Sequence, residues 1–423
     1  MIAIDYNVTS ESKKLPNALD FLEKPRYRWY SYKEGFSPDL VQLAIESTST
    51  SKKDLIIDPF NGSGVVTLYA SMNGYTAKGI EVNPFASFMA QTKQLNTKLS
   101  LFDKQYSLLL ETIQKCKFVS SLINYSTFSE GKNKEKWLFN KGVLNSFESG
   151  WRMICANSNY NQILKLALIA SALDNCNAVK DGKCLKYRVN WKEKGFNKDT
   201  FISSLKGRVK AIREDIINTK IQKQATIITG DSRILTKNST SKKFKLCITS
   251  PPYLNSFDYT DVYRPELFLG EFIKSSDELY NQRKKTIRSH VEIKLEKPTD
   301  SDLGSIFHNT YAEICSHSQK MWSNQLPIMI HAYFEDMKLI LNNLFKQGGQ
   351  NSELWLVVST SAYCGIEIPV DLIIGEIGAR LGWFLDEIKV LRYINKRKSK
   401  NSPNISELRE SLIIFKHNKK RGT

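Results

Sequence analysis

The residues Thr249 to Tyr253, in the order Thr-Ser-Pro-Pro-Tyr, combine the groups needed to hold a flat polar ring. They follow the apolar run 244–248, which predicts a buried strand. Two consecutive prolines remove two backbone donors and fix two φ angles, and the residue before each proline is held extended. The strand therefore ends in a stiff lip of hydroxyl, carbonyl and aromatic groups that suits a nucleobase. The candidate catalytic residues are Ser250, Pro251, Pro252 and Tyr253.

A second set of candidates lies in the segment Asp58 to Gly64, with the sequence Asp-Pro-Phe-Asn-Gly-Ser-Gly. Glycines there let the backbone approach a ligand, and a helix that begins after the turn offers free N–H groups. Glu81 ends the next predicted strand, where its carboxylate can accept ribose hydroxyls. The segment has neither a Gly-Lys-Ser/Thr nor a G-x-G-x-x-G pattern, so a nucleoside-type cofactor with a cationic tail near Asp58 fits better than a pyrophosphate.

Asp231 ends a third predicted strand, residues 225–231. Its carboxylate could accept a hydrogen bond from an adenine amino group, while the alternative is a helix N-cap. In series with Asp58 and Glu81, the ligand interpretation is favoured.

The elements that must position these residues alternate between strand and helix. Ser37 and Pro38 predict the start of a helix, and residues 55–81 predict a βαβ unit. Strand patterns resume after residue 220, at 225–231, 244–248 and 354–358, and two more at 384–392 and 411–415 could pair as a hairpin. We therefore expect an α/β fold with three parts: residues 1–94 and 221–423 form the catalytic domain, and 95–220 form an inserted, mainly helical subdomain.

The charge of the chain indicates a nucleic-acid partner. Among 423 residues, 61 are Lys or Arg and 43 are Asp or Glu, which gives a net charge of +18. Such an excess favours binding to phosphates, although a generally basic proteome would also produce it. The seven cysteines are scattered without a C-x-x-C pair, which predicts reduced thiols, no metal site and a cytoplasmic location. No signal peptide or apolar run of about 20 residues is present in the sequence, so no membrane contact is expected.

Together, the segments 58–64 and 249–253 resemble the motifs of amino-group DNA methyltransferases that depend on S-adenosylmethionine. The Ser-Pro-Pro-Tyr form is similar to the N4-cytosine enzymes, since the adenine enzymes usually carry Asp or Asn in place of Ser250. The resemblance covers residues 26–92 and 225–415 and implies a Rossmann-like fold, with a mostly parallel seven-stranded sheet and an antiparallel edge hairpin. The cofactor-binding residues that it implies are Phe36, Asp58, Pro59, Phe60, Gly62, Ser63, Gly64, Glu81, Asn83, Asp231 and Ser232.

The resemblance also implies a mechanism of base flipping and direct transfer. Ser250 Oγ and the Pro251 carbonyl would draw the amino hydrogens of cytosine out of the ring plane, and Tyr253 would stack on the base. A C5-cytosine enzyme would need a nucleophilic cysteine in a Pro-Cys pair, and the sequence has none; Cys247 lies inside a predicted strand and is expected in the core.

The partner is expected to be double-stranded DNA, together with a restriction endonuclease that shares its target. We expect the insertion 95–220 to supply much of the target recognition, helped by the basic segment 274–297, which has no apolar stripe and is predicted to be a mobile loop. Three alternatives stay open: N6-adenine methylation of DNA, methylation of RNA bases, and a non-catalytic recognition subunit. The expected DNA contacts are Lys180, Lys183, Lys186, Arg188, Arg283, Lys284, Lys285 and Arg288.

Overall fold

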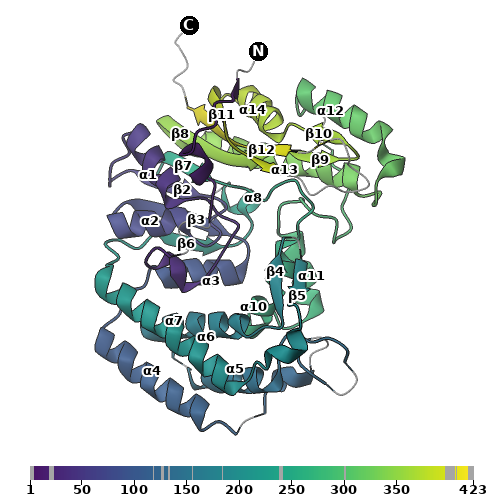
Figure 1. The fold of residues 1–423 in the computed structure, drawn as a ribbon. Coiled ribbons are helices and arrows are strands. Elements are labelled where there is room, and N and C mark those ends of the chain that lie inside the picture. Colours follow the sequence, from purple (N-terminus) through teal and green to yellow (C-terminus); the bar gives the residue numbers. More distant parts are fainter. Residues whose placement is uncertain are drawn as a thin grey trace.

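The computed structural model of the chain describes residues 4–18, 23–117, 119–124, 128–131, 134–154, 156–182, 184–237, 242–299, 302–395, 405 and 407–417. At its centre is an eight-stranded sheet with the order β1-β11-β12-β8-β7-β2-β3-β6 (Figure 1). Strands β6, β3, β2, β7 and β8 are parallel neighbours, and β12 is antiparallel to both β8 and β11. The strands are β1 (Ile4–Asp5), β2 (Leu55–Asp58), β3 (Thr76–Glu81), β6 (Thr226–Thr229), β7 (Phe244–Thr249), β8 (Gly348–Ser359), β11 (Phe384–Asn395) and β12 (Glu407–Lys416).

This order confirms the expected Rossmann-like methyltransferase fold with its antiparallel hairpin. The strand order reverses between β2 and β7, and ligands bind at the crevice that such a reversal opens beside the carboxyl ends of the strands. One detail differs from the prediction. Strand β1 pairs in parallel with β11, so the sheet has an eighth strand and the hairpin is not its edge. An exposed strand edge carries unpaired backbone groups, and β1 satisfies part of that edge.

Side chains on the central strands alternate between two hydrophobic cores. Ile56, Leu246 and Ile248 face the core that contains α1 and α2, whereas Ile57 and Cys247 face the core that contains α12, α13 and α14. This alternation follows from the two-residue repeat of a strand. Cys247 is fully buried, as expected. The helices of these layers are α1 (Pro38–Ser47), α2 (Val65–Asn73), α12 (Ser305–Ser316), α13 (Leu326–Gln347) and α14 (Val370–Arg380).

The described residues between 95 and 220 form a helical bundle that lies below the sheet in Figure 1. Its core is continuous with Phe85 and Met89 of α3 (Pro84–Lys93), so the bundle packs directly on the catalytic domain. A two-stranded hairpin interrupts the helices and carries Lys180 and Lys186, two of the predicted DNA contacts. The elements are α4 (Leu99–Gln114), α5 (Lys141–Met153), α6 (Asn159–Asp174), β4 (Ala178–Asp181), β5 (Cys184–Tyr187) and α7 (Lys198–Asn218).

Arg26 joins the two points where the chain enters and leaves this bundle. Its side chain is 1% exposed, and its guanidinium donates to the carbonyl of Leu95 at 3.0 Å and to that of Thr219 at 2.9 Å. Its backbone N–H donates to Asp215 Oδ2 at 2.8 Å. Both ends of the insertion are therefore held by one buried cation, which fixes the bundle against the catalytic domain.

The chain after the lip is ordered, so the expectation of a mobile loop at 274–297 is wrong. Helix α11 (Ser276–Lys284) occupies its first part, after the short helices α9 (Tyr259–Val262) and α10 (Arg264–Leu269). Ile287, Ile293 and Leu295 are buried in the core that contains α13. Isolated apolar residues without a helical repeat still bury their side chains, which a search for an apolar stripe misses. None of the helices in the described ranges combines the length and the apolarity that a membrane crossing requires.

Candidate active site

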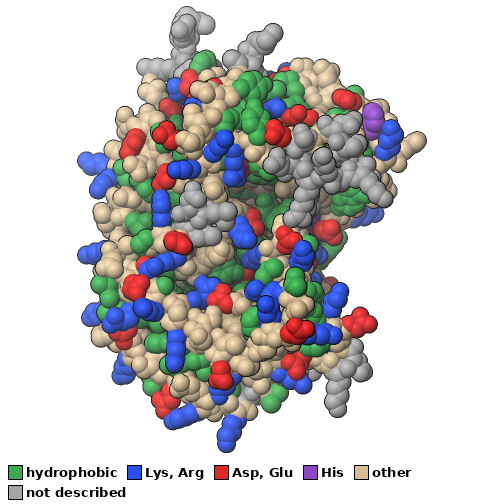
Figure 2. Space-filling model, viewed as in Figure 1, with side chains coloured by type: hydrophobic (Ala, Val, Ile, Leu, Met, Phe, Trp, Pro, Cys, Tyr) green, Lys and Arg blue, Asp and Glu red, His purple; other side chains and the backbone are tan. Residues whose placement is uncertain are grey.

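A cavity of about 580 Å³ lies at the carboxyl ends of the parallel strands. The segment 58–64 and the lip both contribute to its wall, although they are about 190 residues apart in the chain. The face drawn in Figure 2 is hollowed between the sheet and the helical bundle, and Lys and Arg side chains stand around the hollow. Of the predicted residues, those in the cavity wall are Phe36, Pro59, Phe60, Gly62, Glu81, Asn83, Asp231, Ser232, Ser250, Pro251, Pro252, Tyr253, Lys180 and Lys285.

Glu81 fixes the segment 58–64, the glycine loop, at the cavity. Its Oε2 accepts from the backbone N–H of Gly62 at 2.6 Å, and its Oε1 accepts from that of Asn83 at 2.8 Å. Burial raises the pKa of Glu81 to about 7. The carboxylate thus keeps the loop in place and still faces the cavity, where it could accept hydroxyl hydrogens from a ligand.

Gly64 lies behind the cavity wall and is required for packing. Its φ of +84° is unfavourable for other residues, and a Cβ there would stand 2.8 Å from Ala90 Cβ on α3. Ser63 is buried beside it. Ser63 and Gly64 therefore support the loop, and neither is among the described residues that line the cavity.

Asp58 connects the glycine loop to the lip. Thr249 Oγ1 donates to Asp58 Oδ1 at 2.6 Å, and the backbone N–H of Phe60 donates to the same oxygen at 3.0 Å. Asp58 is 2% exposed, and burial raises its pKa to about 7. Next to this link, the Ser232 hydroxyl donates to the Pro59 carbonyl. Asp58 thus holds the ends of β2 and β7 together. It is not among the described residues that line the cavity, where the cationic tail of the expected cofactor would lie.

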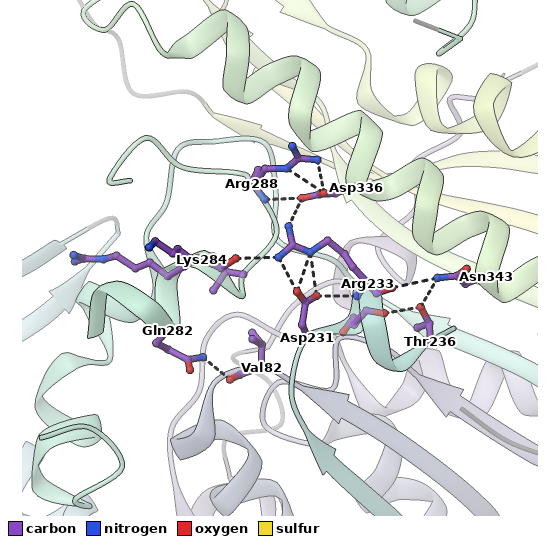
Figure 3. A network of polar contacts seen from close by, with 12 residues as sticks. Val82, Asp231, Arg233, Thr236, Gln282, Lys284, Arg288, Asp336 and Asn343 are labelled. Carbon is purple, nitrogen blue, oxygen red and sulfur yellow. Dashed lines mark hydrogen bonds and ion pairs between the residues drawn. The ribbon is translucent and has the colours of Figure 1, made fainter. Parts of the chain in front are cut away.

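Asp231 lines the cavity, caps a helix and pairs with an arginine. It N-caps α8 (Ser232–Leu235), and its oxygens accept from the backbone N–H of Arg233 at 2.8 Å and from Arg233 Nη2 at 2.7 Å (Figure 3). Arg233 also pairs with Asp336 at 3.1 Å and donates to the Lys284 carbonyl at 3.0 Å. The N-cap alternative is therefore confirmed, and the contact of Asp231 with an adenine amino group stays a prediction.

The lip is held from behind by two residues that sequence reasoning missed. Ser250 Oγ lies 3.4 Å from Tyr253 Oη, and Tyr253 Oη donates to Glu410 Oε1. Arg392 Nε lies 2.5 Å from the other oxygen of Glu410. Arg392 and Glu410 are direct partners across β11 and β12, so opposite charges in the predicted hairpin were the available signal. Both residues line the cavity, which no local pattern indicated.

Lys180 reaches the cavity from the β4–β5 hairpin, but its charge is neutralised internally. Its Nζ lies 2.5 Å from Glu266 Oε1 and 3.4 Å from the centroid of the Tyr263 ring. Tyr263 in turn stacks on Tyr32, with ring centroids 5.2 Å apart. Lys180 therefore joins the insertion to an aromatic wall of the cavity, and its contact with DNA stays a prediction.

The three arginines predicted to contact DNA also make internal contacts. Arg188 Nε donates to the Cys176 carbonyl at 2.8 Å, near the end of α6, and Arg283 Nε lies 2.7 Å from Asp258 Oδ2. Arg288 Nη2 lies 2.6 Å from Asp336 Oδ1 (Figure 3). Because these guanidinium groups hold carboxylates and carbonyls of their own chain, they stabilise the loops around the cavity.

The remaining predicted DNA contacts are lysines. Lys186, Lys284 and Lys285 have exposed side chains, and their ammonium groups can reach a phosphate. Lys183 lies outside the described residues. Within the described part of the chain, no group of three or more His, Cys, Asp or Glu residues could hold a metal ion.

The chain is similar over most of its length to two kinds of type II methyltransferase. It is 27% identical over 445 aligned residues to M.BsoBI of Geobacillus stearothermophilus, which covers 92% of this chain and 85% of that protein. It is 26% identical over 428 residues to M.AvaI of Nostoc and Anabaena, which covers 90% of this chain and 84% of that protein. No family model matches the sequence.

Solved structures align with the chain only loosely. One is a class I S-adenosylmethionine-dependent methyltransferase from Listeria monocytogenes, with a TM-score of 0.30, 9% identity and coverage of 91% of this chain and 60% of that one. The strand order described above defines the fold.

Proposed function

We propose that this protein is a DNA methyltransferase that uses S-adenosylmethionine to methylate the N4 amino group of cytosine in duplex DNA. The observation that carries the proposal is the shared cavity: the glycine loop with Glu81 lines one part of it and the Ser-Pro-Pro-Tyr lip lines another. A cofactor and a base bound there would lie side by side. The similarity to type II methyltransferases over about nine-tenths of the chain supports the same class of activity.

The cavity fits the cofactor through groups that point into it. Glu81 would accept the ribose hydroxyls, and the backbone of Pro59 to Gly62 would lie along the nucleoside. Phe36, two residues before α1, would contact the methionine end. When bound, S-adenosylmethionine supplies an electrophilic methyl group on a sulfonium centre.

The lip would hold the target base and make its amino group reactive. The amino nitrogen of cytosine has its lone pair delocalised into the ring, which makes it a poor nucleophile. Ser250 Oγ and the Pro251 carbonyl would accept its two hydrogens and draw them out of the ring plane, while the Tyr253 ring would stack on the base. Positioning and electrostatic stabilisation then supply most of the rate. A base that is stacked and paired inside a duplex could not make these contacts with the lip, so it must be flipped out of the helix.

Duplex DNA is the proposed partner because the surface charge and the relatives agree. The net charge of +18 favours a polyanion, and the exposed Lys285, directly after α11, lines the cavity. We assign target recognition largely to residues 95–220. Exchange of this segment for that of a related enzyme should change the methylated sequence without loss of cofactor affinity, and an unchanged sequence would refute the assignment.

The proposal also places the protein in a restriction–modification system, in line with the type II relatives. Methylation of its target would protect that site from an endonuclease with the same specificity. DNA from cells that express the protein should resist such an enzyme, and sensitivity at the methylated site would contradict this role.

The decisive experiment identifies the methylated nucleoside. The protein is incubated with methyl-labelled S-adenosylmethionine and duplex DNA, RNA or no nucleic acid, and the digested product is analysed by mass spectrometry. N4-methylcytosine in DNA is expected, whereas N6-methyladenine or a labelled RNA base overturns the proposed substrate. Ser250→Ala should lose activity, while Ser276→Ala, a change at an exposed serine of α11, should not. No transfer to any substrate would leave a non-catalytic recognition subunit.

A further inference from the structure

We propose that Glu410 makes Ser250 a directed hydrogen-bond acceptor by acting through Tyr253, and that the proton released in methyl transfer leaves along the same three residues. This inference rests on the proposed function. Glu410 would then be a positioning residue for the lip, and the serine in the motif would depend on a carboxylate from a distant strand.

The three residues form a continuous chain of oxygens beside the cavity. Ser250 Oγ lies 3.4 Å from Tyr253 Oη, and Tyr253 Oη is hydrogen-bonded to Glu410 Oε1. Glu410 is 3% exposed, and Arg392 holds its other oxygen at 2.5 Å. Arg392 also donates to the Pro16 carbonyl at 3.3 Å, which fixes the guanidinium in turn.

The order of donors in this chain follows from charge. Burial and the nearby Glu410 carboxylate raise the pKa of Tyr253 well above its usual value, so the phenol keeps its proton and donates it to Glu410. The Tyr253 oxygen is then an acceptor, and the Ser250 hydroxyl donates to it. This leaves the lone pairs of Ser250 Oγ for an amino group in the cavity, which brings only donors.

A serine without this support would be ambiguous, since a hydroxyl can point its hydrogen toward the base. The hydroxyl hydrogen would then face an amino hydrogen of the base, and the Ser250 oxygen would not accept that amino hydrogen. A carboxylate at the end of the chain also polarises both hydroxyls, because hydrogen bonds in series strengthen one another. A serine hydroxyl is a weaker acceptor than the acid or amide that adenine enzymes usually carry in place of Ser250. Glu410 thereby compensates for this difference.

The same three hydrogen-bonded residues can carry away the proton that methyl transfer releases. As the N–CH3 bond forms and the S–CH3 bond breaks, the amino nitrogen gains positive charge and releases one proton to Ser250 Oγ. Ser250 passes its own proton to Tyr253, and Tyr253 passes its own to Glu410, which becomes a neutral carboxyl group. Burial already raises the pKa of Glu410, against the opposing effect of Arg392. Since Glu410 lines the cavity, it can return the proton to solvent after product leaves.

The test uses Glu410→Gln and Tyr253→Phe, singly and combined, in the full-length protein. The matched controls are Glu407→Gln, an exposed glutamate of the same strand, and Tyr393→Phe, an exposed tyrosine of β11. Single-turnover methylation of duplex DNA should fall about 10- to 100-fold in each single variant, as expected for loss of a hydrogen bond to a charged group. The double variant should be no slower than the slower single variant, because both changes break one chain. The controls should keep the wild-type rate.

One measurement separates this role from a structural one, and a second tests the hydrogen bond itself. The Kd of S-adenosylmethionine, measured by calorimetry, should be unchanged in all variants, since none of the altered atoms is assigned to the cofactor. The urea midpoints of the ligand-free proteins should be non-additive for the pair Tyr253 and Glu410, because the hydrogen bond exists before any ligand binds.

Full methylation rates in Glu410→Gln, or rate losses that multiply in the double variant, would overturn the inference. If Glu410→Gln fails to fold, Tyr253→Phe carries the test, since it removes a single oxygen, and a wild-type rate in that variant would overturn it. If the wild-type protein itself transfers no methyl group, the proposed function fails. The urea midpoints then test the hydrogen bonds alone. Additive effects of the Tyr253 and Glu410 variants on the midpoint would show that the two residues are not coupled.

Discussion

The link between Thr249 and Asp58 predicts a destabilisation whose size depends on pH. Thr249→Val keeps the volume of a fully buried side chain and removes the hydroxyl that donates to Asp58 at 2.6 Å. Loss of a hydrogen bond to a charged group costs about 1.5–3 kcal/mol, and loss of one between neutral groups costs about 1 kcal/mol. Because the pKa of Asp58 is raised to about 7, its carboxyl group is charged at pH 8.5 and neutral at pH 5.5. The variant should therefore lose about 1.5–3 kcal/mol at pH 8.5 and about 1 kcal/mol at pH 5.5.

The sign follows from proton linkage. The pKa of Asp58 in the folded state, about 7, lies above that of an unfolded aspartate, so between these values the folded protein binds more protons. The contribution of Asp58 to stability is therefore present at low pH and is lost as pH rises through about 7. Removal of the Thr249 hydroxyl takes away a group that favours the charged carboxylate, which raises the pKa of Asp58 further and increases the loss at high pH.

Urea denaturation at the two pH values measures this effect. Thr226→Val, a change at an exposed threonine of β6, is the matched control and should shift stability little at either pH. Equal destabilisation of Thr249→Val at pH 5.5 and pH 8.5 would refute the assigned ionisation of Asp58, and no destabilisation would refute the hydrogen bond.

Three further predictions concern the surroundings of the cavity. A Cβ at Gly79 would stand 2.5 Å from Asn61 Cγ, so Gly79→Ala should cost about 1–3 kcal/mol in urea denaturation and weaken cofactor binding, while unchanged binding would show that the loop does not depend on Asn61. The affinity for S-adenosylmethionine should rise with pH through about 7 as Glu81 ionises to accept hydroxyl hydrogens, and calorimetry should find a flat profile in Glu81→Gln. Arg233→Met should cost about 3 kcal/mol, because it leaves Asp231 without its cation, whereas Asp336 keeps Arg288; a melting temperature equal to that of wild type would contradict this network.

Much of the fold could be predicted because its signals are local. Ser37 caps α1 and Pro38 begins it, as expected, since capping depends on residues within one helical turn. The strands that end at Asp58, Glu81 and Thr249 also follow from short apolar runs. Parallel strands place such ends at one edge of a sheet, which is why most of the predicted cofactor and catalytic residues meet at one cavity.

Partners of charged side chains could not be predicted, because they lie far away in the sequence. Lys180 pairs with Glu266 and Arg288 pairs with Asp336, so two of the predicted DNA contacts also form internal ion pairs. A run of basic residues shows the number of charges but not the carboxylates that will fold against them. The β4–β5 hairpin and β1 were missed for a similar reason, because very short strands are stabilised by their neighbours rather than by their own sequence.

The sequence by itself determined that a stiff Ser-Pro-Pro-Tyr lip and a glycine loop would end neighbouring strands, because proline, glycine and apolar periodicity act within a few residues. The tertiary structure alone decided what stands behind them. Tyr253 meets Glu410, 157 residues away, because β12 runs antiparallel beside β8 and brings that carboxylate to the lip. Contacts of this kind depend on the order of strands in the sheet, which emerges only when the whole chain has packed.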